Sequence, residues 1–265
     1  MSQVDQEYDI YRALAFVYDQ VMEEVNYEHW ADFIDEIMQT HHRDPLRILE
    51  LGCGTGSLAL SLDELMCYSI LATDKSPEMI NVARRKKQEM ITSRVSFDVV
   101  DFMDLSPLHP RKFDVVLLTF DSINYLHHQD LILQLLEEVQ QVLNEEGIFI
   151  FDFTTPQNSE QAIQSLDGEE GYYENFYYHR KSRYDEEDRI HVNTFTIQQL
   201  DDDRENVIDS FQEVHKQRIY TLSEMRSIIH NSSFDILSQY EGFDLVDADD
   251  DSLRVTMTLT CPQTT

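Results

Sequence analysis

The stretch Arg47-Ile-Leu-Glu-Leu-Gly-Cys-Gly-Thr-Gly-Ser57 decides the fold of this chain. It leads from an apolar run through an acid and a glycine-rich turn into a helical pattern, which predicts a strand, a loop and a helix in succession. Gly52, Gly54 and Gly56 allow the backbone to turn sharply and to approach a ligand without a Cβ in the way. Asp74 ends the next apolar run, where a carboxylate can accept both hydroxyls of a ribose. The pattern therefore predicts a site for a nucleotide-like ligand.

Two carboxylates narrow the choice of that ligand. Glu50 stands directly before the glycine loop, where its charge repels a pyrophosphate but suits a cationic amino-acid group. With Asp74, it favours S-adenosyl-L-methionine (SAM) as the cofactor. The loop also contains Gly54-x-Gly56-x-x-Ala59, which fits a dinucleotide fingerprint, so a nicotinamide cofactor stays open as an alternative. A glycine turn without a ligand is disfavoured, because three of the seven glycines of the chain lie here.

Composition and charge limit the class of protein. The chain has 265 residues, of which 51 are acidic and 20 basic, and a net charge of −31. Such a surface repels phosphate backbones, so we expect no nucleic-acid partner, and high salt would screen its self-repulsion. The sequence shows no membrane-length apolar run, no signal peptide and no disulfide framework. We therefore expect an acidic, cytoplasmic protein that does not enter a membrane.

The spacing of apolar residues predicts a doubly wound α/β sheet. Two helices, over 8–24 and 27–40, are expected before the glycine loop. Strands then alternate with helices, which implies a mostly parallel sheet with ligands at the carboxyl ends of its strands. The expected strands are 46–51, 68–73, 94–100, 113–119 and 147–153, and the expected helices between them are 56–66, 77–90 and 129–143.

The pattern changes after the fifth expected strand. Residues 171–219 show no helical periodicity, and the alternation Ile190-x-Val192-x-Thr194-x-Thr196 indicates an antiparallel sheet with one solvated face. The β-like runs cover 171–184, 189–199 and 207–219, with polar turns between them.

A helix near Leu222 and two strands, at about 233–241 and 252–260, bring the main sheet to seven strands. We therefore expect three parts: N-terminal helices over 1–45, a cofactor-binding α/β domain over 46–156 and 220–265, and an inserted antiparallel β cap over 157–219.

Several of these strings resemble a known family. Glu50-Leu-Gly-Cys-Gly-Thr-Gly56 resembles motif I of the class I SAM-dependent methyltransferases, and Asp74-Lys-Ser-Pro-Glu-Met79 resembles the segment after their second strand. A closer resemblance, to the bacterial YqeM-type methyltransferases, covers nearly the whole chain. It rests on Tyr11-x-x-x-Ala15-x-Val17-Tyr-Asp19, Asp121-Ser-Ile-Asn-Tyr-Leu126, Phe151-Asp152 and Glu213-Val-His-x-Gln-Arg218. The resemblance implies a Rossmann-like methyltransferase fold with SAM as cofactor, and it specifies the cofactor better than the reaction.

The resemblance also assigns most of the cofactor site. It implies that Asp74 holds the ribose, and that the carboxylate of Asp101 and the backbone N–H of Phe102 read the adenine edge. The helix that carries Tyr11 and Tyr18 would close over the cofactor and offer hydroxyl groups to its methionine end or to the acceptor. The predicted cofactor residues are Tyr18, Trp30, Glu50, Gly52, Gly54, Gly56, Asp74, Lys75, Met79, Asp101, Phe102 and Phe120.

Methyl transfer from a sulfonium is an in-line displacement, so the protein must align the acceptor, exclude water and remove a proton where the acceptor carries one. His215 is the candidate base or orienting group, because an imidazole changes charge near neutral pH. Tyr11 is a second catalytic candidate, and Asp121 is the candidate to bind a cationic amine. The structural alternative for His215 is a hydrogen-bonded strand histidine, and for Tyr11 it is a core aromatic on an amphipathic helix. The candidate substrate-binding residues are Asn124, Tyr125 and Asp152.

Strings that are typical of other methyl transfers are missing. The segment Thr119-Phe-Asp-Ser-Ile-Asn124 lacks the proline pair of the enzymes that methylate planar nitrogens, and it has no cysteine nucleophile for carbon-5 of a pyrimidine. No metal-binding string is present. We therefore expect transfer to a nitrogen or oxygen of a small-molecule acceptor. A protein or tRNA methyltransferase and a SAM-binding module without turnover stay open as alternatives, and no pattern indicates the oligomeric state.

Overall fold

The computed structural model describes residues 10–65 and 67–262, which form two β-sheets. The larger sheet contains β1 (Arg47–Leu51), β2 (Ser69–Asp74), β3 (Ser96–Val99), β4 (Phe113–Leu118), β5 (Leu143–Thr154), β10 (Asp235–Glu241) and β11 (Arg254–Thr260). Its order is β10-β11-β5-β4-β1-β2-β3. The pairs from β5 to β3 are parallel, and β11 is antiparallel to both of its neighbours. The predicted seven-stranded, mostly parallel sheet is confirmed.

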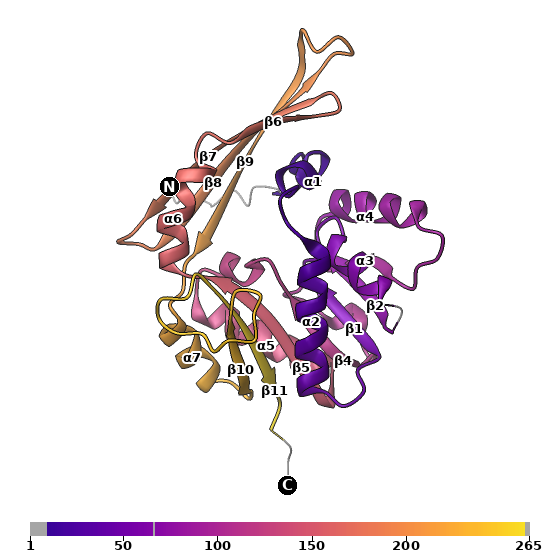
Figure 1. Ribbon diagram of the computed structural model, residues 1–265, viewed down its shortest axis with the longest axis vertical. Helices are drawn as coiled ribbons and strands as arrows, with labels where there is room; N and C mark the ends of the chain where they lie inside the picture. Colours follow the sequence, from indigo (N-terminus) through magenta and orange to yellow (C-terminus); the bar gives the residue numbers. More distant parts are fainter. Residues whose placement is uncertain (1–9, 66, 263–265) are drawn as a thin grey trace, which may run out of the picture.

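Helices cover both faces of this sheet (Figure 1). One face packs against α2 (Tyr27–His41), α3 (Ser57–Glu64) and α4 (Pro77–Glu89), and the other packs against α5 (Gln129–Val142) and α7 (Leu222–His230). Successive residues of a strand point to opposite faces, so Ile48 joins the first core and Leu49 the second. In the described ranges, no helix is long and apolar enough to cross a membrane.

The smaller sheet is an antiparallel cap between β5 and α7. It consists of β6 (Glu170–Tyr173), β7 (Phe176–Asp185), β8 (Ile190–Leu200) and β9 (Val207–Arg218), paired in that order. The run predicted over 171–184 is two strands, because the chain turns at residues 174–175, where Glu174 has a φ of 49°. Figure 1 shows the cap projecting from the main sheet, above the level of α4.

A helix that the sequence analysis did not predict leads into the cap. It is α6 (Pro156–Leu166), and it packs against β7. Its start follows ordinary rules, because the side chain of Thr155 accepts the N–H of Asn158 and Pro156 occupies the first turn. The inserted segment is therefore a helix followed by four strands, rather than strands alone.

The helix predicted over 8–24 is wrong within the described residues. Residues 10–24, which we call the strap, contain only η1 (Leu14–Phe16) and α1 (Tyr18–Val21). Tyr11 has a left-handed backbone with a φ of 68°, and the N–H of Ala13 donates to Glu213 rather than to a helical carbonyl. A distant carboxylate thus overrides the local helical pattern. The start of that predicted helix, Tyr8, lies outside the described residues.

Candidate functional site

The glycine loop between β1 and α3 is braced by hydrogen bonds to the end of β2. The N–H of Gly54 donates to Oδ2 of Asp74 at 2.9 Å, and the N–H of Ser76 donates to Oδ1 at 2.8 Å. At Gly56, φ is +76° and a Cβ would lie 2.6 Å from the ring of Phe97, so the position requires glycine. Each carboxylate oxygen has two lone pairs, so Asp74 can accept further hydrogen bonds from a ligand.

Glu50 lies beneath this loop and is 2% exposed. Its Oε2 has no hydrogen-bond partner within the described chain. Burial, and then the charge of Asp74, raise the pKa of Glu50 to about 8, against a smaller opposing effect of the Ala59 N–H. An unsatisfied buried acceptor is costly. A cationic ammonium group bound beside the loop would satisfy this oxygen, so the structure fits a cofactor with an amino-acid end.

A narrow cavity of about 90 Å³ runs along the loop, and we call it the cofactor cavity. Eight of the predicted cofactor residues line it: Tyr18, Gly52, Gly54, Asp74, Lys75, Met79, Phe102 and Phe120. The lining residues that were not predicted include four with hydroxyl groups: Tyr27, Thr55, Ser57 and Ser122. Sites for cofactor-sized ligands have volumes of ~300–1,000 Å³. The strap forms part of this wall, and we expect it to move outward when a cofactor enters.

Four predicted cofactor residues do not line this cavity: Glu50, Gly56 and Asp101, and Trp30, which lines the larger cavity described below. Glu50 and Gly56 lie behind the wall of the cofactor cavity, where they support the loop. Asp101 is exposed, and its carboxylate accepts the N–H of Met103 at 2.9 Å. Its contact with an adenine ring therefore stays a prediction.

A larger cavity, of about 550 Å³, lies between the main sheet and the cap, and we call it the cap chamber. Tyr11, Tyr18, Phe120 and Tyr125 line both this chamber and the cofactor cavity, so these four side chains form a shared wall. Trp30 was predicted to flank the cofactor, but it lines only the cap chamber. There it packs against Phe120, with ring centroids 3.8 Å apart.

The face of the cap that points into this chamber is polar. Antiparallel pairing places Arg180, Phe195 and Glu213 in one row across β7, β8 and β9. The next row is Ser182, Asn193 and His215. Side chains on directly opposed residues share a face, and most of these polar side chains are buried. Arg180, Asn193 and His215 of these rows line the cap chamber, so the cap presents polar groups to the space that a ligand could occupy.

His215 ends a chain of hydrogen bonds that starts at the shared wall. The hydroxyl groups of Tyr11 and Tyr125 lie 2.6 Å apart, and that of Tyr125 lies 3.0 Å from Nδ1 of His215. Nε2 of His215 lies 3.3 Å from Oε2 of Glu213. A carboxylate can only accept, so Nε2 carries the proton and Nδ1 accepts from Tyr125. Tyr125 in turn accepts the O–H of Tyr11.

Glu213 holds both the histidine and the strap. Its carboxylate accepts the backbone N–H groups of Tyr11, Ala13 and Leu14, at 2.7, 2.6 and 3.1 Å. Burial alone would raise the pKa of Glu213, but the hydrogen bonds from His215 and from the strap lower it. The carboxylate is therefore ionised at neutral pH. The sequence string that contains His215 also contains Glu213, two residues earlier and on the same strand face.

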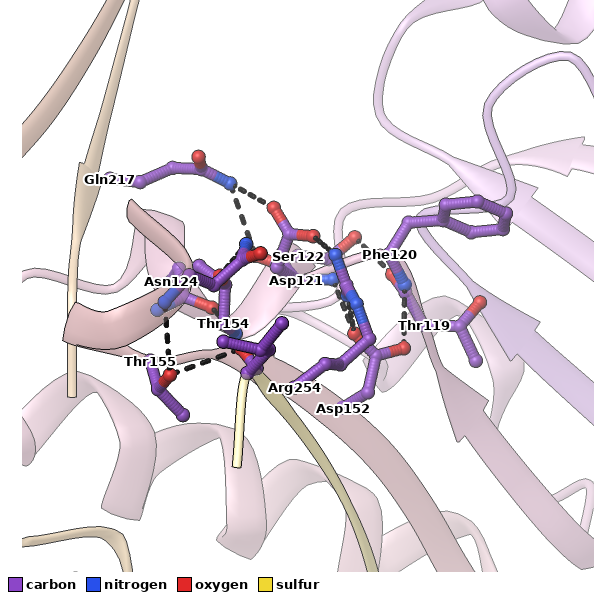
Figure 2. Close-up of polar contacts among 12 residues, drawn as sticks. Thr119, Phe120, Asp121, Ser122, Asn124, Asp152, Thr154, Thr155, Gln217 and Arg254 are labelled. Atoms are coloured by element: carbon purple, nitrogen blue, oxygen red, sulfur yellow. Dashed lines mark hydrogen bonds and ion pairs between the residues drawn. The ribbon is translucent and has the colours of Figure 1, made fainter. Parts of the chain in front are cut away.

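The loop after β4 is fixed by charges, as Figure 2 shows. Arg254, from β11, donates to Asp121 at 2.5 Å and also to Asp152. Asp152 accepts the N–H groups of Phe120 and Asp121 at 2.8 and 2.7 Å. The left-handed backbones of Phe120 and Asp121, with φ of 59° and 48°, are thus held in place.

This arrangement bears on three of the predicted residues. Asp121 lines the cap chamber, but its charge is paired with the guanidinium of Arg254, so it does not offer an uncompensated charge to an amine. Asp152 and Asn124 line neither cavity. Asn124 instead donates to the carbonyl of Arg218 and accepts the N–H of Thr154. We therefore assign Asp152 and Asn124 to positioning the loop.

Other residues of the cap chamber were missed by the sequence analysis. The alternation in Glu213-Val-His-x-Gln217 could have indicated Gln217, which lines the chamber, and Glu213, which holds His215 from behind, because residues two apart share a strand face. No local signal indicated Arg180, Asn193 or Arg254, whose partners come from other strands and loops.

Comparison with known proteins identifies the family. The family described as Methyltransferase domain matches residues 42–227. The chain belongs to this methyltransferase family. YqeM of Bacillus subtilis (strain 168) is 26% identical over 228 residues, which cover 86% of this methyltransferase and 87% of that protein. A demethylmenaquinone methyltransferase of Leptospira interrogans is 27% identical over 123 residues, or 46% of this chain and 48% of its own.

Solved structures of other methyltransferases have a similar fold. A SAM-dependent methyltransferase from Clostridium acetobutylicum ATCC 824 superposes with a TM-score of 0.73 at 24% identity, over 95% of this chain and 98% of that chain. CalS10, a SAM-bound amino pentose methyltransferase from Micromonospora echinaspora, gives a TM-score of 0.66 at 16% identity, over 93% and 97%. The family and the site thus agree, and the methyltransferase uses SAM as its cofactor.

Proposed function

We propose that this enzyme transfers a methyl group to a nitrogen or oxygen atom of a small molecule that binds in the cap chamber. The observation that carries the proposal is the shared wall, because the side chains of Tyr11, Tyr18, Phe120 and Tyr125 face both cavities. The cap chamber, at about 550 Å³, has the size of a small-molecule site, ~300–1,000 Å³. An amino pentose methyltransferase among the proteins of similar fold is consistent with such an acceptor.

The cofactor would be held from both sides of the glycine loop. Asp74 can accept from the ribose hydroxyls, and Glu50 can bind the ammonium group. When bound, SAM supplies a methyl group that is activated by its sulfonium. The task left to the chain is to align the acceptor, exclude water and take up the acceptor's proton.

We assign proton removal to the chain Tyr11–Tyr125–His215. The acceptor gives its proton to the oxygen of Tyr11, Tyr11 gives its own proton to Tyr125, and Tyr125 gives its own proton to Nδ1 of His215. The pKa values of Tyr11 and Tyr125 are raised by burial, so both tyrosines relay the proton without staying ionised. The resulting imidazolium is stabilised by the adjacent carboxylate of Glu213.

Methyl transfer from SAM to a panel of amines and hydroxy compounds tests this proposal, with the formation of S-adenosylhomocysteine as the readout. For His215→Ala, we expect turnover to fall by a factor of ~10²–10⁴, the usual contribution of a positioned base. The affinity for SAM should stay near that of the wild type, because His215 does not line the cofactor cavity.

His128→Ala is the matched control, because His128 is exposed and lines neither the cofactor cavity nor the cap chamber. Tyr125→Phe should resemble His215→Ala, since it removes the middle hydroxyl of the chain. If His215→Ala and Tyr125→Phe both keep normal turnover on a good acceptor, the assignment of the base is wrong.

A further inference from the structure

A polar recess of about 140 Å³ opens off the cap chamber toward α6. Five side chains line both spaces: Asp121, Arg180, Asn193, Gln217 and Arg254. The recess therefore continues the chamber on the side away from the strap. Its depth is lined by Thr154, Asn158, Ser159 and His191.

Arg180 brings unused hydrogen-bond donors into this space. Its side chain is only 14% exposed. Nε donates to Oδ1 of Asn193 at 2.9 Å and Nη1 to Glu169 at 3.2 Å. Within the described chain, Nη2 makes no hydrogen bond. A guanidinium has five N–H donors, so most of those on Arg180 lack a protein acceptor although the group is largely removed from solvent.

The neighbours of Arg180 add more donors. Because Oδ1 of Asn193 accepts from Arg180, its NH₂ group faces elsewhere, and no described residue accepts from it. Nε of Arg254 is likewise without a described acceptor, since only its two Nη atoms are engaged. The Oγ of Ser159 is buried and has no partner in the described residues.

Asp121 is the carboxylate that lines the recess, and it is already engaged. Both oxygens of Asp121 already accept, one from Arg254 and one from Gln217. Burial, and then the charge of Arg180, lower the pKa of His191 to about 4, so its imidazole is neutral at neutral pH. Buried donors require acceptors. Arg180 is paired with Glu169, and Arg254 with Asp121 and Asp152, yet the recess still holds a surplus of N–H donors without a described acceptor.

From this surplus we propose that the recess binds an oxyanion, a carboxylate or a phosphate, carried by the methyl acceptor. Arg180 holds it through its free guanidinium N–H groups, and the NH₂ group of Asn193 supplies a further hydrogen bond. The proposal rests on the proposed function, because it takes the cap chamber as the acceptor site. An anionic group of the acceptor would thus bind in the region where a cationic amine was expected at Asp121. The atom that receives the methyl group would lie at the other end of the acceptor, beside the shared wall.

The fluorescence of Trp30 provides a direct test. Trp30 is the one tryptophan of the chain, and its ring lies 5.7 Å from the guanidinium carbon of Arg254. Benzoate and phenyl phosphate would be titrated into the enzyme in the presence of S-adenosylhomocysteine at fixed ionic strength. Benzamide and benzylammonium are the neutral and cationic comparisons.

We expect saturable changes in emission with one or both anions, which bind about tenfold tighter than benzamide, the typical gain from a charged hydrogen bond. The two anions separate a carboxylate from a phosphate anchor. Arg180→Gln should remove this preference, and Arg180→Lys should retain part of it, because lysine keeps the charge but lacks the planar fork. Arg183→Gln is the matched control, since Arg183 lies exposed on the same strand.

Three results would overturn the inference: anions that bind no tighter than benzamide, benzylammonium as the tightest probe, or equal effects of Arg180→Gln and Arg183→Gln. Thermal stabilisation by S-adenosylhomocysteine reports whether each variant is folded. If Arg180→Gln does not fold, the comparison is made with Arg180→Lys instead. The titration needs no turnover. A failed oxyanion site therefore leaves the methyl transfer intact, whereas absent product formation on every acceptor counts against the proposed function alone.

Discussion

Glu50 couples the stability of the fold to pH, because its carboxyl group is buried and keeps its proton up to about pH 8. Between the ordinary pKa of a glutamate, ~4.3, and this value, the unfolded chain loses the proton while the folded chain retains it. The free energy of unfolding must therefore fall as pH rises through this window, by up to ~1.4 kcal/mol per pH unit from this residue. Above about pH 8 the contribution of Glu50 levels off.

Glu50→Gln removes this dependence, since the amide is neutral at every pH. We expect the stability of the variant, relative to wild type, to increase steadily from pH 5 to pH 8 in urea unfolding experiments. Glu36→Gln is the control, because Glu36 is exposed on α2. If the free energies of unfolding of wild type and Glu50→Gln change in parallel between pH 5 and pH 8, the carboxyl group of Glu50 is not protonated in the folded protein.

Glu213 acts on two elements at once, the strap and strand β9. In Glu213→Gln, the amide NH₂ cannot accept, so either the strap N–H groups or His215 lose their acceptor. We expect faster hydrogen exchange at the backbone amides of the strap, together with a fall in kcat/KM of about tenfold or more, since charged hydrogen bonds contribute ~1.5–3 kcal/mol. Asp209→Asn, an exposed change on the same strand, should alter neither. Unchanged exchange at residues 11–14 would contradict the role of Glu213 in fastening the strap.

Elements whose apolar pattern is local were predictable. The strands and helices of the main sheet follow the expected ranges closely, because each buries a stripe or a face that its own sequence defines. The strap was not predictable, since the N–H groups of Tyr11 and Ala13 bond to a carboxylate about 200 residues away. The sequence shows that Asp121 is acidic. It does not show that Arg254, 133 positions later, forms an ion pair with it, because that contact depends on the fold.

The glycine loop and Asp74 were found from sequence because a single local motif builds that half of the site. The polar face of the cap was only partly found. Its members come from three strands, and only the pairing of β7, β8 and β9 brings Arg180, Asn193 and His215 together.

The whole molecule carries a net charge of −31. Repulsion among these charges destabilises the compact state, and salt reduces its range from ~10 Å at 0.1 M to ~3 Å at 1 M. We expect the urea midpoint to rise between low and molar KCl. Sucrose at equal osmolality is the control, because it stabilises folded proteins without screening charge. A midpoint that stays constant in KCl would mean that the acidic surface carries no net penalty at low salt.

The strap has one further consequence, which concerns the rate of the catalytic cycle. Tyr11 and Tyr18 belong to the walls of both cavities, so an outward movement of the strap that admits the cofactor also changes the wall of the cap chamber. We therefore expect strap opening to set an upper limit on turnover, as lid opening does in many enzymes. A substitution that loosens the strap would then speed exchange of the cofactor but weaken the enclosure that the chemistry needs.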